Sequence, residues 1–109
     1  MEEQVRLELY VPADHLRVVV EALHQAGAGR VGAYDHTCAV TPVTGHWRPL
    51  EGATPYEGTV GELSQAPELK VEMRCPRSLA SQAVRAARAA HPYEEPVIDV
   101  IQLLNVGNH

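Results

Sequence analysis

Residues 91–96 (His-Pro-Tyr-Glu-Glu-Pro) concentrate an imidazole, a phenol and two carboxylates in one short turn. The two prolines fix φ at about −65° and favour extended geometry in the residues before them, so the turn is stiff. Imidazole nitrogens and carboxylate oxygens are both zinc ligands, and we expect His91 and Glu94 to bind a divalent metal ion. Tyr93 and Glu95 are expected to contact a small-molecule ligand. The alternative is architectural, with His91 at the negative end of a helix dipole.

A second candidate group lies in a stretch from residue 31 to about residue 41, which is expected to form a strand. His36 and Cys38 are two residues apart, so in a strand their side chains project from the same face. An imidazole and a thiolate form a feasible two-ligand arm for zinc or copper. We expect His36 to approach His91 in a shared metal site; the alternative is that both strand residues face the core.

The third candidate region is the glycine- and proline-rich stretch at about residues 42–67, between the second and third expected strands. A loop of this length in a compact domain is usually functional or disordered, and aromatic residues disfavour disorder. Trp47 and Arg48 are expected to contact an anionic effector or a neighbouring subunit. The alternative is a loop that folds back on its own domain with Trp47 as its anchor.

The composition of the 109 residues bounds the class of protein. This length predicts one domain, residues 1–109, and the net charge of −5 with dispersed arginines argues against nucleic acid as a partner. No apolar run approaches the roughly 20 residues of a membrane helix, and the acidic start lacks a signal-peptide pattern. Cys38 and Cys75 form no CxxC pair, and we expect them to be buried small hydrophobic residues. Without an export signal, the expected compartment is a reducing cytoplasm.

Six segments carry the periodic patterns of secondary structure. Alternation of apolar and polar residues predicts strands at 5–11 and 69–75, and a nearly continuous apolar run predicts another at 97–104. Helical spacing predicts helices at 14–26 and 78–90, with Asp14 and Ser78 as N-caps. With the strand at 31–41, the order is β-α-β-β-α-β.

This order is the ferredoxin-like α+β arrangement, with an antiparallel sheet and two helices on one face. Right-handed crossovers predict the strand order 4-1-3-2. The long loop and the 91–96 turn leave the same end of the sheet, so we expect them to be neighbours. The last strand lies at an edge, and an apolar edge strand is an aggregation hazard unless it is covered, so we expect a homo-oligomer.

Four motifs, taken together, resemble those of a known family. They are GAGRVGAYDH at 27–36, RPLEG at 48–52, PYEG at 55–58 followed by VG at 60–61, and HPYEE at 91–95. They are similar to the YqfO-type proteins, which include small stand-alone domains and the same domain inserted in the larger dinuclear-metal-centre hexameric (Nif-three-like) proteins. The resemblance implies a fold like that of CutA and the PII signalling proteins, which are trimers; in PII proteins, effectors bind between subunits.

The resemblance also limits what can be expected of the chain. The dinuclear metal site of the larger proteins lies in their flanking domains, so no hydrolase or cyclohydrolase residues are implied here, and we expect no catalytic residue. The expected function is a PII/CutA-like oligomer, a trimer, that binds a divalent metal ion (zinc or copper) or a small-molecule effector near subunit junctions in a regulatory role. The alternatives are a structural or protein-interaction module and a metal-dependent hydrolase.

Overall fold

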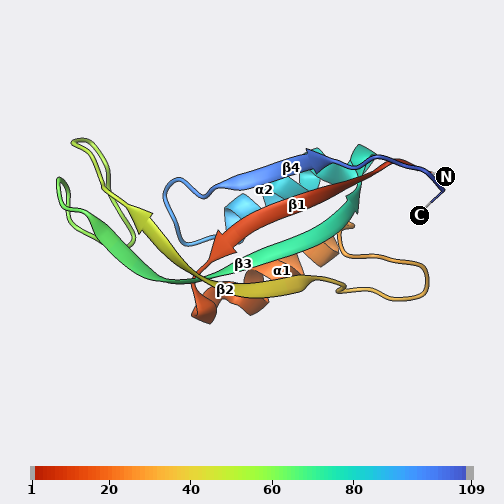
Figure 1. Cartoon of the computed structure of the whole chain (residues 1–109), viewed down its shortest axis with the longest axis horizontal. Coiled ribbons are helices and arrows are strands. Elements are labelled where there is room, and N and C mark those ends of the chain that lie inside the picture. The colour runs from red at the N-terminus through yellow and green to blue at the C-terminus, as the bar shows by residue number, and fades with distance from the viewer. Residues whose placement is uncertain (1, 108–109) are drawn as a thin grey trace.

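The computed structural model describes residues 2–107, which form a four-stranded sheet with two helices and two short 3₁₀ turns (Figure 1). The elements, in chain order, are β1 (Gln4–Val11), η1 (Ala13–His15), α1 (Leu16–Gln25), β2 (Ala39–Trp47), β3 (Ser64–Pro76), η2 (Arg77–Leu79), α2 (Ala80–Ala90) and β4 (Ile98–Gln102). The predicted α+β class and the β-α-β-β-α-β order are confirmed.

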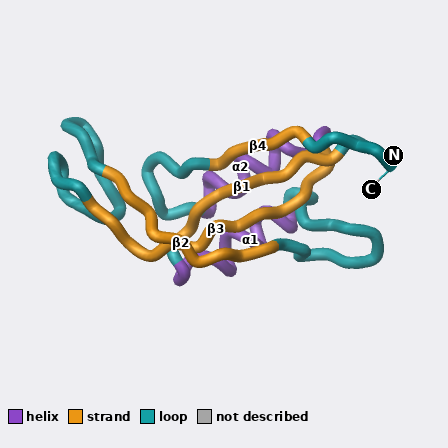
Figure 2. Tube along the Cα trace, in the orientation of Figure 1, coloured by secondary structure: helices purple, strands orange, loops and turns teal. Residues whose placement is uncertain are grey.

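The sheet has the order β2-β3-β1-β4, which is the predicted 4-1-3-2 arrangement, and every neighbouring pair is antiparallel. Both helices cover the same face of the sheet (Figure 2). They run in opposite directions, so α1 ends beside the chain termini while α2 ends towards the β2–β3 hairpin (Figure 1). No helix among residues 2–107 is long and apolar enough to cross a membrane.

The core lies between the sheet and the helices, and the strand alternation builds it. Every second residue of β1 is buried, and the same alternation continues in the second half of β3. Alanines at Ala83 and Ala87 make up the buried face of α2 together with Ala80, and such small side chains let the helix approach the sheet closely. The largest fully buried side chains are Leu7, Leu9, Val11, Val19, Leu23, Val71, Met73 and Cys75.

The second strand differs from the prediction. β2 begins at Ala39 rather than near residue 31, and the preceding residues form a loop. Gly29 has a positive φ of 82°, which turns the chain away from the end of α1 before extended structure begins. The prediction that His36 and Cys38 share a strand face is therefore wrong.

The loop between β2 and β3 is shorter than the predicted 42–67. The two strands pair from Ala39↔Glu72 as far as Trp47↔Ser64, so the loop covers residues 48–63. Pro42 lies inside β2, where it is tolerated because β2 is an edge strand. The strands form a long hairpin that projects beyond the helices at the left of Figure 1.

The predicted helix caps are also wrong. Each helix follows a 3₁₀ turn, and none of these turns or helices has a side-chain N-cap hydrogen bond. Asp14 accepts a hydrogen bond from the neighbouring His15, and the hydroxyl of Ser78 donates to the carboxylate of Glu2. A proline at the head of each 3₁₀ turn sets the entry geometry instead.

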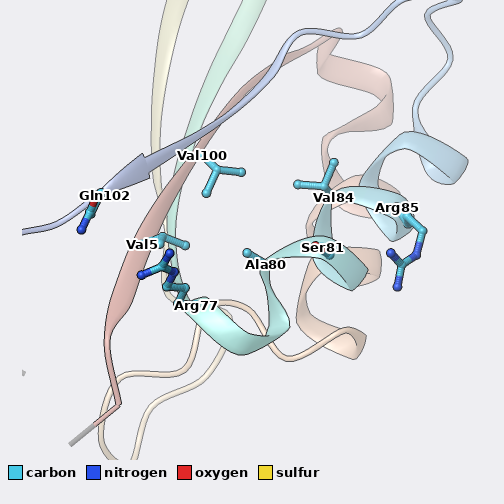
Figure 3. Close-up of a pocket in the computed structure, with 8 residues that line it drawn as sticks. All are labelled: Val5, Arg77, Ala80, Ser81, Val84, Arg85, Val100 and Gln102. Carbon is cyan, nitrogen blue, oxygen red and sulfur yellow. The ribbon is translucent and has the colours of Figure 1, made fainter.

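β4 is shorter than the predicted 97–104 and occupies the edge of the sheet, as expected. A hollow of about 520 Å³ separates it from α2. Figure 3 shows Val84 of α2 and Val100 of β4 facing this hollow. Its lining consists of Val5, Arg77, Ala80, Ser81, Val84, Arg85, Val100 and Gln102.

Candidate functional site

His91 is the C-cap residue of α2 and is 8% exposed. Each of its two ring nitrogens makes a hydrogen bond with a backbone group. Its Nε2–H donates to the carbonyl oxygen of Tyr10 at 2.6 Å, and its Nδ1 accepts from the amide N–H of Tyr93 at 3.1 Å. A carbonyl only accepts and an amide N–H only donates, so these partners fix the neutral tautomer. Burial lowers the pKa of His91, which favours the same neutral form. No ring nitrogen is left for a metal ion.

Tyr93 connects the 91–97 turn to the hairpin. Its hydroxyl donates to Glu68 Oε2 of β3 at 2.7 Å, and its ring lies 5.8 Å from that of Tyr56, measured between centroids. The pKa of the Tyr93 phenol is raised mainly by burial and, to a smaller extent, by the hydrogen bond to Glu68. The neutral phenol therefore acts as a fixed donor at ordinary pH.

The 48–63 loop also contacts the turn. Glu94 Oε1 accepts a hydrogen bond of 2.9 Å from the amide N–H of Thr54. Within the hairpin, Trp47 Nε1 donates to the carbonyl oxygen of Glu57 at 3.2 Å. The long loop and the 91–96 turn are therefore neighbours, as the strand order predicted, and Trp47 anchors its own loop.

These contacts surround a hollow of about 710 Å³ between the hairpin and the turn, here called the hairpin–turn cleft. Its walls combine aromatic rings, aliphatic side chains and a few charged groups, as small-molecule sites commonly do. The lining residues are Tyr10, Val43, Thr44, Gly45, His46, Trp47, Arg48, Pro49, Leu50, Ala53, Pro55, Tyr56, Glu57, Glu68, Tyr93, Glu94, Glu95 and Val97.

The four residues predicted to contact a small molecule lie together in this lining: Trp47, Arg48, Tyr93 and Glu95. Glu94, predicted as a metal ligand, is also there. The charges are unequal, because four glutamates face a single arginine. A cleft of this charge favours neutral or cationic molecules over polyanions.

The remaining predicted metal ligands lie elsewhere. His36 lies in the loop before β2, at the end of the molecule opposite to the turn (Figure 1). Cys38 is half-buried and packs against the core. Since the two helices run in opposite directions, the end of α1 and the end of α2 cannot bring His36 and His91 together. The structure does not gather these residues and Glu94 into one site.

His36 instead lies against the end of α1. Its Nε2 is 2.7 Å from Glu21 Oε2, its Nδ1 is 2.9 Å from Asp35 Oδ1, and its ring centroid is 3.7 Å from that of His24. The hydrogen bonds to Asp35 and then Glu21 raise the pKa of His36. We refer to Glu21, His24, Asp35 and His36 as the α1-end cluster.

Sequence reasoning missed two residues that shape the cleft. Glu68 accepts a hydrogen bond from the Tyr93 hydroxyl. In the sequence it is only one of several polar residues of β3. Gly45 lies in β2 where a Cβ atom would collide with the Glu68 carboxylate, so only glycine leaves Glu68 in place. Neither role has a signal in the spacing of the sequence, because the role of Glu68 depends on the approach of the 91–96 turn to β3 and that of Gly45 on the pairing of β2 with β3.

Known proteins with similar sequences are several times longer than this chain. The chain is 38% identical over 96 residues to a "GTP cyclohydrolase 1 type 2 homolog" of Mycobacterium leprae, an alignment that covers 88% of the chain. The chain spans about a quarter of the length of the curated relatives that it matches. No family model matches the chain.

Solved structures give a consistent result. A Bacillus cereus protein related to NIF3 superposes with a TM-score of 0.83 and 36% identity, over 95% of this chain and 26% of that one. The divalent ion tolerance protein CutA1 of Ehrlichia chaffeensis has a TM-score of 0.72 at 17% identity, over 99% of this chain and 88% of that one. The second likeness concerns the fold alone. The chain is thus similar in sequence and fold to one segment of the NIF3-related, YqfO-type proteins, and its fold is PII/CutA-like.

Proposed function

We propose that this PII/CutA-like chain, as one domain, binds a small organic effector in the hairpin–turn cleft. One observation carries the proposal: the four residues predicted as ligand contacts come from two distant parts of the chain and line one cleft. Its volume of about 710 Å³ lies within the usual range of ligand sites, about 300–1,000 Å³. Trp47 and Arg48 contribute from the hairpin, and Tyr93 and Glu95 from the turn.

The chemistry of the lining restricts the effector. The carboxylates of Glu68 and Glu94 are already engaged by protein donors, which leaves Glu57 and Glu95 to accept hydrogen bonds from a ligand. The rings of Tyr56 and Tyr93 offer an aromatic wall. The best-matched effector has an aromatic or apolar body and N–H donors, and is neutral or cationic.

We propose that the effector site lies near a junction between subunits of a homo-oligomer, a trimer. Eight of the eleven exposed large hydrophobic residues among 2–107 lie in the hairpin loop or at β4 and its flanks: Leu50, Tyr56, Val60, Leu63, Val97, Val100, Leu104 and Val106. These residues form two groups of exposed hydrophobic side chains, one beside the cleft and one at an edge strand. Association between copies of the chain would cover both groups.

We propose a regulatory role, which the construction of the cleft supports. The 48–63 loop contacts the turn through the hydrogen bond from Thr54 to Glu94, so a ligand between them would hold the two together. Occupancy would then change the surface that the loop offers to a partner protein. The competing function is a protein-interaction module without a ligand, which the exposed hydrophobic residues of the loop favour.

We propose binding rather than turnover for this chain. The cyclohydrolase name belongs to relatives that are several times as long. Both ring nitrogens of His91 are hydrogen-bonded to backbone groups, so this histidine of the 91–96 turn is not free to act as a general base. We consider zinc or copper binding separately from the effector site, because the three side chains of residues 2–107 that are grouped closely enough to hold a metal ion, His24, Asp35 and His36, lie outside the cleft.

Trp47 provides the test, because it is the chain's single tryptophan and it lines the cleft. Its fluorescence is followed while tyramine, adenosine and ATP are added in turn. We expect saturable changes with tyramine or adenosine that weaken in Tyr93→Ala and in Glu95→Gln. The matched control is Glu62→Gln, an exposed change in the same loop but outside the cleft. Tighter binding of ATP than of both other probes, or equal responses in all variants, would contradict the proposal.

A further inference from the structure

The α1-end cluster joins two imidazoles and two carboxylates. Figure 1 shows the end of α1 and the loop before β2 at the opposite end of the molecule from the tip of the β2–β3 hairpin. One ligand atom each from His24, Asp35 and His36 can be chosen so that all three lie within 4.8 Å of one another. Glu21 joins them through its 2.7 Å contact with His36. The cluster shares no residue with the cleft lining.

The way α1 ends brings the residues of this cluster together. Ala28 N–H donates to the carbonyl of Leu23, and Gly27 N–H donates to that of His24, which is the Schellman pattern. Gly27 has the positive φ of 103° that this pattern needs. The chain therefore reverses directly after the last turn of α1, with the side chain of His24 facing the loop that follows.

Two further hydrogen bonds fix that loop. Gly29 N–H donates to the carbonyl of Arg74 in β3, and Thr37 N–H donates to the carbonyl of Gly29. The ends of the 29–37 loop are thus tied to each other and to the sheet. This closure returns Asp35 and His36 to the helix that carries Glu21 and His24.

His36 has a positive φ of 56°, the only such value for a residue other than glycine within 2–107. This conformation is unfavourable for an L-residue, so the surrounding contacts must hold it. It directs the imidazole onto His24, with a carboxylate at each ring nitrogen. Whichever nitrogen takes a metal ion, the other keeps a carboxylate that fixes the ring, as ligating histidines usually have.

We infer that the α1-end cluster is a binding site for a divalent transition-metal ion of the zinc class, with His24, His36 and Asp35 as ligands and Glu21 orienting His36. Two imidazoles select zinc or copper over magnesium or calcium, which prefer oxygen ligands. Tetrahedral zinc holds its ligand atoms about 3.4 Å apart. The three donors approach that spacing by side-chain rotation, which is open to Asp35 and His36 because both are exposed.

The inference stands apart from the proposed effector site. A metal ion here would bind at the junction of α1 with the loop before β2, whereas the effector would bind between the hairpin and the 91–97 turn. Metal binding should therefore leave the response of Trp47 to tyramine unchanged. The two proposals fail separately.

Isothermal titration of the metal-free chain with ZnCl₂ tests the site, and the visible absorption of bound Co²⁺ reports its geometry. We expect one metal ion per chain. His24→Gln and His36→Asn should each weaken zinc binding by more than about a hundredfold, and Glu21→Gln by about tenfold. His36→Asn is the gentler variant, since asparagine accepts positive φ more readily than most residues. The matched control is His46→Gln, an exposed histidine of the hairpin.

Circular dichroism of the metal-free variants shows whether each one folds. Loss of zinc binding in folded His24→Gln and His36→Asn, with His46→Gln unaffected, supports the site. A wild-type chain that binds zinc no more tightly than about 100 μM overturns the inference, because two imidazoles and a carboxylate should bind better than this. Equal zinc binding in the wild type and in both histidine variants overturns it as well.

Discussion

His91 and His36 are residues of the same type in two opposite environments. His91 is buried at the end of α2, and its ring nitrogens meet a backbone carbonyl and a backbone amide. His36 is exposed beyond the end of α1, and its ring nitrogens meet two carboxylates. Burial lowers the pKa of the first, while hydrogen bonds to Asp35 and Glu21 raise that of the second.

The difference teaches that the partners of a histidine, more than its position in a motif, decide its role. Backbone groups cannot release their hydrogen bonds without loss of local structure, so His91 shapes the turn that lines the cleft. Carboxylates can exchange a shared proton for a metal ion, so His36 is open to metal chemistry. We therefore propose different roles for the two ends of the molecule: His91 shapes an effector cleft at one end, and His36 contributes to a metal site at the other.

The largest effect should come from removing the buried histidine. His91→Ala leaves the Tyr10 carbonyl and the Tyr93 amide without their partner and opens a cavity, so the free energy of unfolding should fall by about 2–4 kcal/mol. His36→Ala removes an exposed side chain and should change the free energy of unfolding much less. Urea unfolding of the metal-free proteins measures both, with His46→Ala as the control for an exposed histidine. Equal losses for His91→Ala and His36→Ala would remove the distinction.

The next effect concerns the phenol that joins the turn to the hairpin. Tyr93→Phe deletes the donor to Glu68, so we expect about 1–2 kcal/mol less stability and a weaker tyramine response of Trp47. Tyr56→Phe is the matched control, because its ring also lines the cleft but no comparable bond of its hydroxyl joins the hairpin to the turn. Urea unfolding and Trp47 fluorescence give the two values. A Tyr93→Phe protein as stable as Tyr56→Phe would show that the Tyr93–Glu68 bond does not hold the cleft.

A pH series sharpens the assignment of His91 as a neutral residue. Burial lowers its folded pKa below the ordinary 6.5, so below this pH the unfolded chain takes up a proton that the folded chain resists. The contribution of His91 is fully present above about pH 6.5 and is lost as pH falls through the folded pKa. The stability advantage of wild type over His91→Gln should thus shrink between about pH 8 and about pH 5 in urea unfolding with chelator present. An advantage that grows on acidification would mean that His91 is charged in the fold.

The smallest effect is expected at the rim of the cleft. Glu94→Gln keeps an acceptor for the Thr54 amide but removes the charge, so global stability should change by less than about 0.5 kcal/mol. Amide exchange at Thr54 should nevertheless quicken several-fold, since a neutral acceptor makes a weaker hydrogen bond. Glu95→Gln, next to it in the turn, should leave this exchange unchanged. Unaltered exchange at Thr54 in both variants would mean that the loop is held by other contacts.

The fold could be predicted because it depends on local patterns. The alternation from Val5 to Val11 and the helical spacing around Val19 and Leu23 identified β1 and α1, and connection rules then gave the strand order. The prediction was wrong for the segment before β2, where tertiary hydrogen bonds override the local sequence pattern. Residues before Ala39 have a strand-like composition, but they are held in a loop because the Gly29 N–H donates to the carbonyl of Arg74 in β3 and the Gly29 carbonyl accepts from the Thr37 N–H.

The candidate sites were predictable in part. The predicted topology places the hairpin beside the turn, and the expected ligand contacts from these two segments do line one cleft: Trp47, Arg48, Tyr93 and Glu95. The grouping of His36 with His91 did not follow, because it required knowing which end of the sheet each helix leaves. His24 carried no signal in the sequence, since a histidine in the last turn of a helix usually serves the helix dipole.

Amide chemical-shift mapping by NMR tests the division of the molecule most directly. The ¹⁵N-labelled metal-free chain is titrated first with tyramine and then, in a fresh sample, with ZnCl₂. We predict that tyramine shifts amides within residues 43–57 and 91–97, and that zinc shifts amides within residues 21–37, with little overlap. Zinc shifts centred on the 91–97 turn, or tyramine shifts centred on the hollow between α2 and β4, would contradict the account.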